Sequence, residues 1–266
     1  MKKTNYYEIC NQKLKYLNYS DRTTKSYLFY INQFLNSIKI PPTRLTSCDF
    51  QTYLDKYNFT SVSQQNQVIN AIRFLYKFGL EKKYDKVSFK RPKSEKKLPK
   101  VIDGDFIKER LSKIENIKHK SLLTLTYSVG LRVSEVVNLK IEDIDSKRMI
   151  IHIKNAKGRK DRIVPLSNNV LELLRNYFKE YKPKEYLFNG QNSLNYSPNS
   201  CNKIVKKYLG ENYHIHQLRH SCFTNLLESG VDLRIIQKIA GHNNVKTTEI
   251  YTHVSNQLLS KIKLPI

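Results

Sequence analysis

The 266-residue chain has few cysteines, few acidic side chains and no long apolar run. Its cysteines form neither a Cys-x-x-Cys pair nor a zinc-type Cys/His spacing, which argues against a disulfide framework and a structural metal site. They are Cys10, Cys48, Cys201 and Cys222. No segment approaches the roughly 18 apolar residues of a membrane span, and polar residues follow the N-terminal lysines where a signal peptide is apolar. We therefore predict a soluble, cytoplasmic protein that does not enter a membrane.

Basic side chains greatly outnumber acidic ones. The chain has 47 Lys and Arg against 23 Asp and Glu, which gives a formal net charge of +24 and a pI of about 9.8. Such a surplus is typical of proteins that bind polyanions. A composition rich in Lys, Asn and Tyr also arises from an AT-rich genome, so part of the surplus has that second explanation. The length allows two domains that each bury a core.

Residues 1–81 predict a small domain built only of helices. Apolar residues recur on one helical face in three segments, and each segment has a signal for where the helix starts or stops. The segments are residues 20–40, a helix that begins after Thr46, and residues 63–78; a shorter helix is predicted near residues 5–17. Ser20 is the expected N-cap of the first segment, the two prolines at 41 and 42 stop it, and Gly79 ends the third.

Basic residues dominate residues 82–99, where two prolines interrupt the chain and apolar periodicity is weak. We interpret this segment as a linker between two domains. Linkers of this kind are often only solvated tethers, but because this one joins two basic halves, we favour a role in following a nucleic-acid backbone. The linker residues predicted to bind nucleic acid are Lys90, Arg91, Lys93, Lys96 and Lys97.

Residues 100–266 predict a second domain that is mainly helical with a small β-hairpin. Two helices come first, then two β-rich runs at 148–154 and 162–166, and then helices to the end. The residues between the two runs, 155–160, include Gly158, as expected of a hairpin loop. This places Lys157 at the tip of the hairpin, with Arg159 and Lys160 as further candidates for binding nucleic acid.

Two patterns in the second domain suit the chemistry of phosphodiester cleavage, which requires groups that neutralise the non-bridging oxygens, supply a nucleophile and protonate the leaving group. Arg132 follows Gly130, which can end a helix in the left-handed conformation and so place the planar guanidinium in a turn. His216 and Arg219 lie three residues apart on a predicted helix, so their side chains share one face. Each pattern also occurs by chance in many proteins, so neither is diagnostic by itself.

Taken together, four segments of the second domain closely resemble the tyrosine recombinase, or phage integrase, family, and are most similar to its Xer-type members. They are Thr126–Glu135, His216–His220, Gly241–His242 and Ile250–Val254. The resemblance is specific after residue 100 and loose before it. It implies a two-domain architecture, with a helical core-binding (SAM-like) domain at 1–81, a basic linker at 82–99 and an α+β catalytic domain at 100–266.

The resemblance also implies six catalytic residues, with no metal and no cofactor. They are Arg132, Lys157, His216, Arg219, His242 and Tyr251. Tyr251 would attack the phosphate, forming a 3′-phosphotyrosyl link and freeing a 5′-hydroxyl. The two arginines and His242 would stabilise the developing charge, His216 would assist proton transfer, and Lys157 would protonate the leaving oxygen. His220 lies one position away from this face, and we expect it to make structural hydrogen bonds.

The implied function is site-specific DNA recombination through a Holliday junction, by a homotetramer on double-stranded DNA at a specific recombination site. A partner recombinase is also compatible, and a prokaryotic protein would associate with the nucleoid. Two alternatives remain: a type IB topoisomerase or telomere resolvase, and a non-catalytic DNA-binding relative. The C-terminal residues 256–264 have apolar positions at helical spacing. This segment would dock either on a neighbouring subunit or on its own subunit. Chromosome-dimer resolution and mobile-element integration or excision are not distinguished by these patterns.

Overall fold

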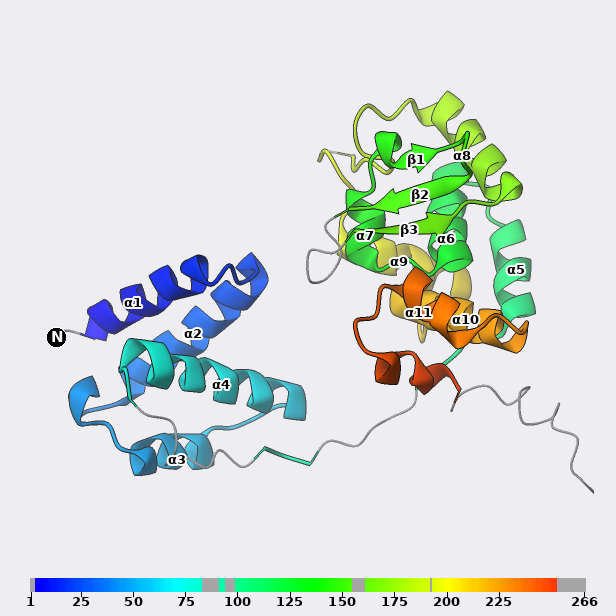
Figure 1. The fold of residues 1–266 in the computed structure, drawn as a ribbon. Coiled ribbons are helices and arrows are strands. Elements are labelled where there is room, and N and C mark those ends of the chain that lie inside the picture. The colour runs from blue at the N-terminus through cyan, green and yellow to red at the C-terminus, as the bar shows by residue number, and fades with distance from the viewer. Residues whose placement is uncertain (1–2, 83–90, 94–98, 155–160, 192, 253–266) are drawn as a thin grey trace, which may run out of the picture. The chain divides into compact units, whose positions relative to one another are not determined.

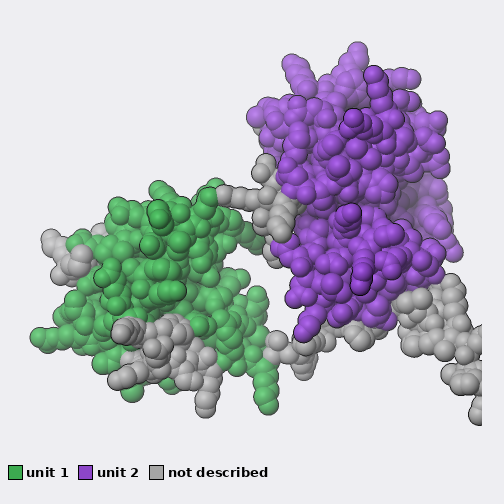
Figure 2. All heavy atoms as spheres, viewed as in Figure 1, with its two compact units in different colours: residues 1–96 green, residues 97–266 purple. Residues whose placement is uncertain are grey.

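The computed structural model describes residues 3–82, 91–93, 99–154, 161–191 and 193–252. The chain divides into two compact units, Met1–Lys96 and Lys97–Ile266, each with its own apolar core (Figure 2). Helices predominate over one small sheet in the described part of the chain, which confirms the predicted fold class. None of the described helices has both the length and the apolar character needed to cross a membrane. The domain limits at 81 and 99 stay predictions, because much of the intervening segment lies outside the described residues.

Helices are the only regular secondary structure among the described residues of the first unit (Figure 1). Its elements are α1 (Lys3–Tyr16), α2 (Asp21–Ser37), the short η1 (Pro42–Arg44), α3 (Ser47–Lys56), α4 (Val62–Phe74) and the π-helical turn η2 (Leu75–Gly79). The hydroxyl of Ser20 accepts a hydrogen bond from the backbone N–H of Thr23, as predicted for the N-cap of α2. In the core, the ring of Phe34 on α2 stacks on that of Phe50 on α3 with 4.9 Å between centroids.

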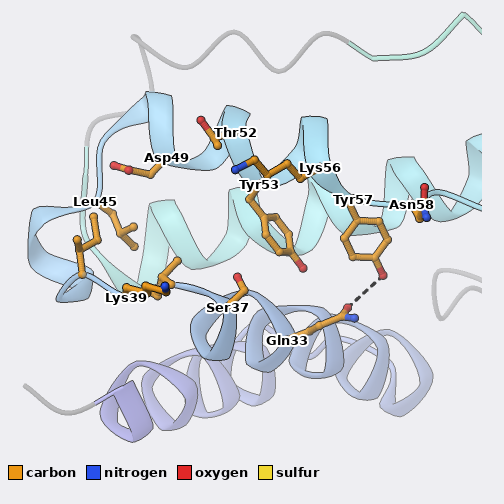
Figure 3. A pocket seen from close by; sticks show the side chains of 12 residues that line it. Gln33, Ser37, Lys39, Leu45, Asp49, Thr52, Tyr53, Lys56, Tyr57 and Asn58 are labelled. Carbon is orange, nitrogen blue, oxygen red and sulfur yellow. Dashed lines mark hydrogen bonds between the residues drawn. The ribbon is translucent and has the colours of Figure 1, made fainter.

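A groove of about 660 Å³ runs between the end of α2 and α3 in the first unit. Figure 3 shows the hydroxyl of Tyr57 donating a hydrogen bond to the side-chain oxygen of Gln33 across one end of it, at 3.0 Å. Lys39 and Lys56 line the groove together with Asp49, so its charges are mixed. None of the six predicted catalytic residues lies in this unit, so the predicted chemistry belongs to the second unit.

The second unit combines a three-stranded antiparallel sheet with helices (Figure 1). Its helices are α5 (Gly104–Ser112), α6 (Ile117–Val129), α7 (Val133–Asn138), α8 (Asn168–Tyr181), α9 (Pro198–Leu209), α10 (Ile215–Glu228) and α11 (Leu233–Ala240), with short turns η4 (Ile141–Asp143), η5 (Val245–Thr247) and η6 (Glu249–Tyr251). Three helices therefore precede the sheet, where the sequence predicted two. The third, α7, has only six residues and so shows little periodicity.

The sheet contains the two predicted strands and one that the sequence did not indicate. The strands are β1 (Ile144–Asp145), β2 (Ile150–Ile153) and β3 (Arg162–Pro165), in the order β1-β2-β3. In the register, Ile153 of β2 lies opposite Arg162 of β3. Pro165, which cannot donate to a neighbouring strand, lies on β3 at the edge of the sheet. The two-residue β1 is too short to produce an alternating pattern.

Helix α10 is the central helix of the second unit, and it packs against α6, α11 and η6. Gly130 ends α6 in the left-handed conformation, with φ at 63°, as its sequence context predicted. A Cβ atom at Gly130 would lie 2.5 Å from the buried ring of Phe223 on α10. The residue is therefore constrained both by its backbone conformation and by the close approach of α10.

Replacing Gly130 with Ala should destabilise the second unit by about 3 kcal/mol, because the left-handed conformation and the contact with Phe223 both penalise a Cβ atom. Urea unfolding of the full chain measures the change. Gly230→Ala is the matched control: its φ is 86° but nothing lies within 4 Å of an added Cβ atom, so only the backbone term of about 1–2 kcal/mol applies. Equal effects of the two substitutions would show that the contact with Phe223 is not constraining.

Candidate active site

Arg132 lies at the N-cap of α7, two residues after the left-handed Gly130. One guanidinium nitrogen donates to Oε1 of Glu135 at 2.7 Å, and the backbone N–H of Arg132 donates to Oε2 of the same residue at 2.7 Å. The other terminal nitrogen lies 3.3 Å from the carbonyl oxygen of Gly241. The side chain is 16% exposed. Arg132 is therefore held in the predicted turn and keeps one side accessible.

Arg219 is buried on α10 and connects the C-terminal ends of two other helices. Its guanidinium donates to the carbonyl oxygen of Gly130 at the end of α6, and to that of Ala240 at the end of α11 at 2.7 Å. It also lies over the ring of Phe223, 4.8 Å from the centroid. Burial, reinforced by the positive charge of Arg132, lowers the pKa of Arg219 to about 10, so the group still carries its charge at neutral pH.

His242 follows Gly241, which ends α11 in the left-handed conformation with φ at 62°. Its Nε2 atom lies 3.2 Å from a guanidinium nitrogen of Arg219, and its Nδ1 atom lies 3.0 Å from Oγ1 of Thr248. Because an arginine can only donate, Nε2 accepts this bond and Nδ1 donates to Thr248. Burial and the nearby Arg219 and Arg132 lower the pKa of His242 to about 4, so the ring is neutral at pH 7.

Tyr251 ends the short turn η6 and is only 1% exposed. Its ring packs beside three others on α10 and after α11, those of Phe223, His220 and His242, with centroids 5.5, 5.9 and 6.4 Å away. Burial raises the pKa of Tyr251 to about 12, although Arg219 and Arg132 are close enough to oppose the shift. The candidate nucleophile therefore lies beside the predicted cations but is enclosed.

His216 lies in the first turn of α10 and is exposed. Partial desolvation, together with the charges of His214, Arg219 and Arg132, lowers the pKa of His216. The sixth predicted residue, Lys157, lies outside the described residues, so five of the six can be located. Four of those five, Arg132, Arg219, His242 and Tyr251, come together in space although they belong to separate segments.

Most of the residues predicted to bind nucleic acid lie outside the described part of the chain. They are Lys90, Lys96, Lys97, Arg159 and Lys160. Lys93 is described and exposed. Arg91 is described too, and its guanidinium donates to the side-chain oxygens of Asn66 and Asn70 on α4, at 2.9 and 2.7 Å. This segment is therefore attached to the first unit at Arg91.

His220 was expected to make structural hydrogen bonds, and this fails at one of its two ring nitrogens. Its Nδ1 atom is buried and has no hydrogen-bond partner among the described residues. Burial, with the adjacent His216 and Arg219, lowers the pKa of His220 to about 4. Its ring instead packs beside that of Tyr251. A single sequence cannot distinguish a packing histidine from a hydrogen-bonding one, because both roles suit the same helical position.

The sequence patterns did not reveal Glu135 and Arg162, which connect the segments of this site. Both carboxylate oxygens of Glu135 accept from the guanidinium of Arg162, at 2.7 and 2.8 Å, in addition to their bonds from Arg132. Burial raises the pKa of the Glu135 carboxyl, but the bonds and charges of Arg162 and Arg132 outweigh it and bring the pKa down to about 2. A glutamate three residues after the N-cap was the available signal, as in a capping box.

Replacing Glu135 with Gln should lower the free energy of unfolding at pH 7 by about 3 kcal/mol, because the guanidinium groups of Arg132 and Arg162, both largely shielded from solvent, lose their counter-ion. The folded-state pKa lies below the ordinary value of 4.5, so this stabilisation is fully present above that pH and is lost as the pH falls towards 2. Urea unfolding at several pH values measures it. The control Glu109→Gln, at an exposed ion pair, should change the free energy of unfolding little. A destabilisation by Glu135→Gln that did not depend on pH would contradict the assignment.

Comparisons with known proteins match both units of the chain. The phage integrase family matches residues 100–257, and the family described as phage integrase, N-terminal SAM-like domain matches residues 7–86. A tyrosine recombinase XerA of Pyrococcus horikoshii is 39% identical over 250 residues, which cover 90% of this chain and 86% of that protein. A tyrosine recombinase XerD of Staphylococcus epidermidis is 34% identical over 215 residues, covering 73% of this chain and 72% of that protein.

Solved structures agree with the fold. A crystal structure of XerA recombinase has 25% sequence identity and a TM-score of 0.56, covering 98% of this chain and 97% of that one. A structure of the XerH site-specific recombinase bound to palindromic difH substrate, a post-cleavage complex, has 22% identity and a TM-score of 0.75, covering 98% of this chain and 83% of that one. The chain belongs to the phage integrase family of tyrosine recombinases.

Proposed function

We propose that this protein is a site-specific DNA recombinase that cuts and rejoins strands through a 3′-phosphotyrosyl intermediate and a Holliday junction. The observation that carries the proposal is the convergence of Arg132, Arg219, His242 and Tyr251 from four separate segments. A protein that only bound DNA would need a basic surface, but it would not need a tyrosine beside two arginines and a histidine. The similarity to tyrosine recombinases across both units supports the same conclusion.

In the proposed reaction, the hydroxyl oxygen of Tyr251 attacks the scissile phosphorus and the bond from phosphorus to the 5′-oxygen breaks. The phenolic proton leaves with the assistance of His216, and Lys157 protonates the departing 5′-oxygen. Arg132 and Arg219 stabilise the charge on the non-bridging oxygens, and His242 does so in the tautomer that carries its proton on Nε2, with Nδ1 accepting from the hydroxyl of Thr248. Because the phosphotyrosyl bond conserves the energy of the phosphodiester, the reverse reaction with a new 5′-hydroxyl rejoins strands without an external energy source.

Tyr251 must move before it can attack, because its side chain is almost fully buried. The segment from Asn243 to Tyr251 contains two three-residue turns, and most of its residues are exposed. Such a segment opens locally at a lower free energy than a packed helix does. Outward movement of η6 would expose the hydroxyl and remove the desolvation that raises the pKa of Tyr251.

We further propose that the protein acts in the cytoplasm as a homotetramer on double-stranded DNA at a specific recombination site, and a partner recombinase is compatible with this. The basic residues of the linker and of the loop at 155–160 would bind the phosphate backbone, and the two units would clamp the duplex. The net charge of +24 supports this role. Residues 256–264, predicted to dock either on a neighbouring subunit or on their own subunit, lie outside the described residues. A type IB topoisomerase is not favoured, because the similarity to recombinases extends through both units.

A suicide substrate, nicked near the cleavage site so that the cut strand is lost, should trap a covalent adduct between protein and DNA. Tyr251→Phe removes the attacking oxygen and should abolish the adduct while leaving DNA binding nearly unchanged. Denaturing gels with labelled DNA measure the adduct. Tyr177→Phe is a control at another fully buried tyrosine and should retain it. A wild-type protein without an adduct would support a DNA-binding relative, and relaxation without strand exchange would support a topoisomerase.

Replacing Arg219 with Ala should slow cleavage by about 10²–10³-fold, because one charged donor to the phosphate is lost. DNA affinity at fixed salt should fall by less than about tenfold, since many other phosphate contacts supply most of it. Adduct rates and gel-shift titrations give the two quantities. Because Arg219 also connects α6 and α11, thermal unfolding checks that the variant is folded. The Arg219→Lys variant, which keeps the charge, is measured in parallel. Equal loss of cleavage and affinity would contradict this role.

A further inference from the structure

Arg162 is a buried arginine to which neither the sequence patterns nor the proposed mechanism gives a task. It is the first residue of β3, and its side chain is 7% exposed. Its two terminal nitrogens each donate to one oxygen of Glu135, at 2.7 and 2.8 Å. Its Nε atom donates to the carbonyl oxygen of Ile239 near the end of α11, at 2.7 Å. The guanidinium therefore pairs with the carboxylate fork to fork, the strongest geometry for such a pair.

The charges in this cluster do not balance. Glu135 is the carboxylate that both guanidinium groups contact, Arg162 through two oxygens and Arg132 through Oε1. Two positive charges and one negative charge leave a net charge of +1. Arg162 has the better geometry and is the less exposed of the two arginines, so Glu135 mainly compensates Arg162. The surplus charge then resides on Arg132, whose side chain is the more accessible.

An independent contact places Arg162 directly against the turn that precedes His242. A Cβ atom at Gly241 would lie 2.9 Å from Cδ of Arg162. The carbonyl oxygen of the same glycine lies 3.3 Å from Arg132. The side chain of Arg162 thus packs beneath the Gly241 turn while the guanidinium of Arg132 reaches the same turn.

We propose that Arg162 is a positioning residue that neutralises Glu135, so that Arg132 keeps its positive charge for the scissile phosphate. Without Arg162, the carboxylate would pair with Arg132 alone, draw the guanidinium into a two-bond pair and cancel its charge. This inference rests on the proposed function, in which Arg132 binds the phosphate. It assigns to Arg162 no contact with DNA.

Single-turnover adduct formation on the nicked duplex tests the charge balance. Arg162→Met, which keeps an apolar stem and removes the charge, should slow cleavage by about 10²-fold, comparable with losing one phosphate donor. Arg162→Lys keeps the charge but cannot form the fork-to-fork pair, so its cleavage rate should fall between those of wild type and Arg162→Met. The double variant Arg162→Met/Glu135→Gln should be at least about tenfold faster than Arg162→Met, because no carboxylate then competes for Arg132. A double variant no faster than Arg162→Met would overturn the proposal.

A substrate with a neutral methylphosphonate at the scissile position separates charge compensation from a purely structural role. This substrate has less negative charge to neutralise, so Arg162→Met should cleave it less than about tenfold more slowly than wild type does. If Arg162 only stabilised the fold, Arg162→Met would slow cleavage of both substrates by the same factor, and this result would overturn the proposal. A substrate with sulfur at the 5′-bridging position has a leaving group that departs without being protonated. If this substrate, and not the methylphosphonate, restored the cleavage rate of Arg162→Met, Arg162 would act on the leaving group and the proposal would be overturned.

Two controls keep the outcomes distinguishable. Arg148→Met makes the same substitution at a side chain that is 79% exposed, and it should leave adduct rates on both substrates unchanged. Thermal unfolding of each variant shows whether the second unit remains folded at the assay temperature. If wild-type protein forms no adduct, the proposed function itself fails. If wild type forms the adduct and Arg162→Met cleaves the phosphodiester at the same rate, only the role of Arg162 fails.

Discussion

The carboxylate of Glu135, buried between the guanidinium groups of Arg132 and Arg162, is the interaction on which the candidate site depends. A buried carboxylate is costly unless it is fully paired, and here each oxygen accepts bonds from both arginines. The partners belong to α7 and β3, and Arg162 also reaches the end of α11. Pairing this one charge therefore fixes where three segments meet, and it lets the fold hold two cations close together.

Arg219, the third arginine of the site, is buried and is stabilised in another way. Arg219 donates to carbonyl oxygens at the C-terminal ends of α6 and α11, where the helix dipoles carry partial negative charge. Gly130 and Gly241 allow this arrangement, because each adopts the left-handed conformation and turns the chain directly after its helix. Partial charges support the guanidinium without cancelling it. The site thus brings three arginines together, and the carboxylate of Glu135 pairs with two of them, Arg132 and Arg162. The resulting surplus of positive charge suits a ligand that is itself an anion.

Tyr251 serves two purposes that impose opposite requirements. In this structure its ring completes the small apolar cluster of Phe223, Leu227, Ile236 and Ala240, and that burial stabilises the end of the second unit. In the proposed reaction its oxygen must reach phosphorus. Short turns rather than a long helix connect it to α11, so the packing can be given up locally while α10 and the cation cluster stay in place.

The sequence by itself determined the helical periodicity, the helix limits at Ser20 and Gly130, and the four motifs that indicate the family, because these depend on neighbours within a few residues. It also singled out Arg132, Arg219, His242 and Tyr251. Only the tertiary structure decided that Arg162 shares Glu135 with Arg132, that His220 packs rather than hydrogen-bonds through Nδ1, and that Tyr251 is enclosed. These features join residues far apart along the chain, and ion pairing and burial arise only when folding brings such residues into contact.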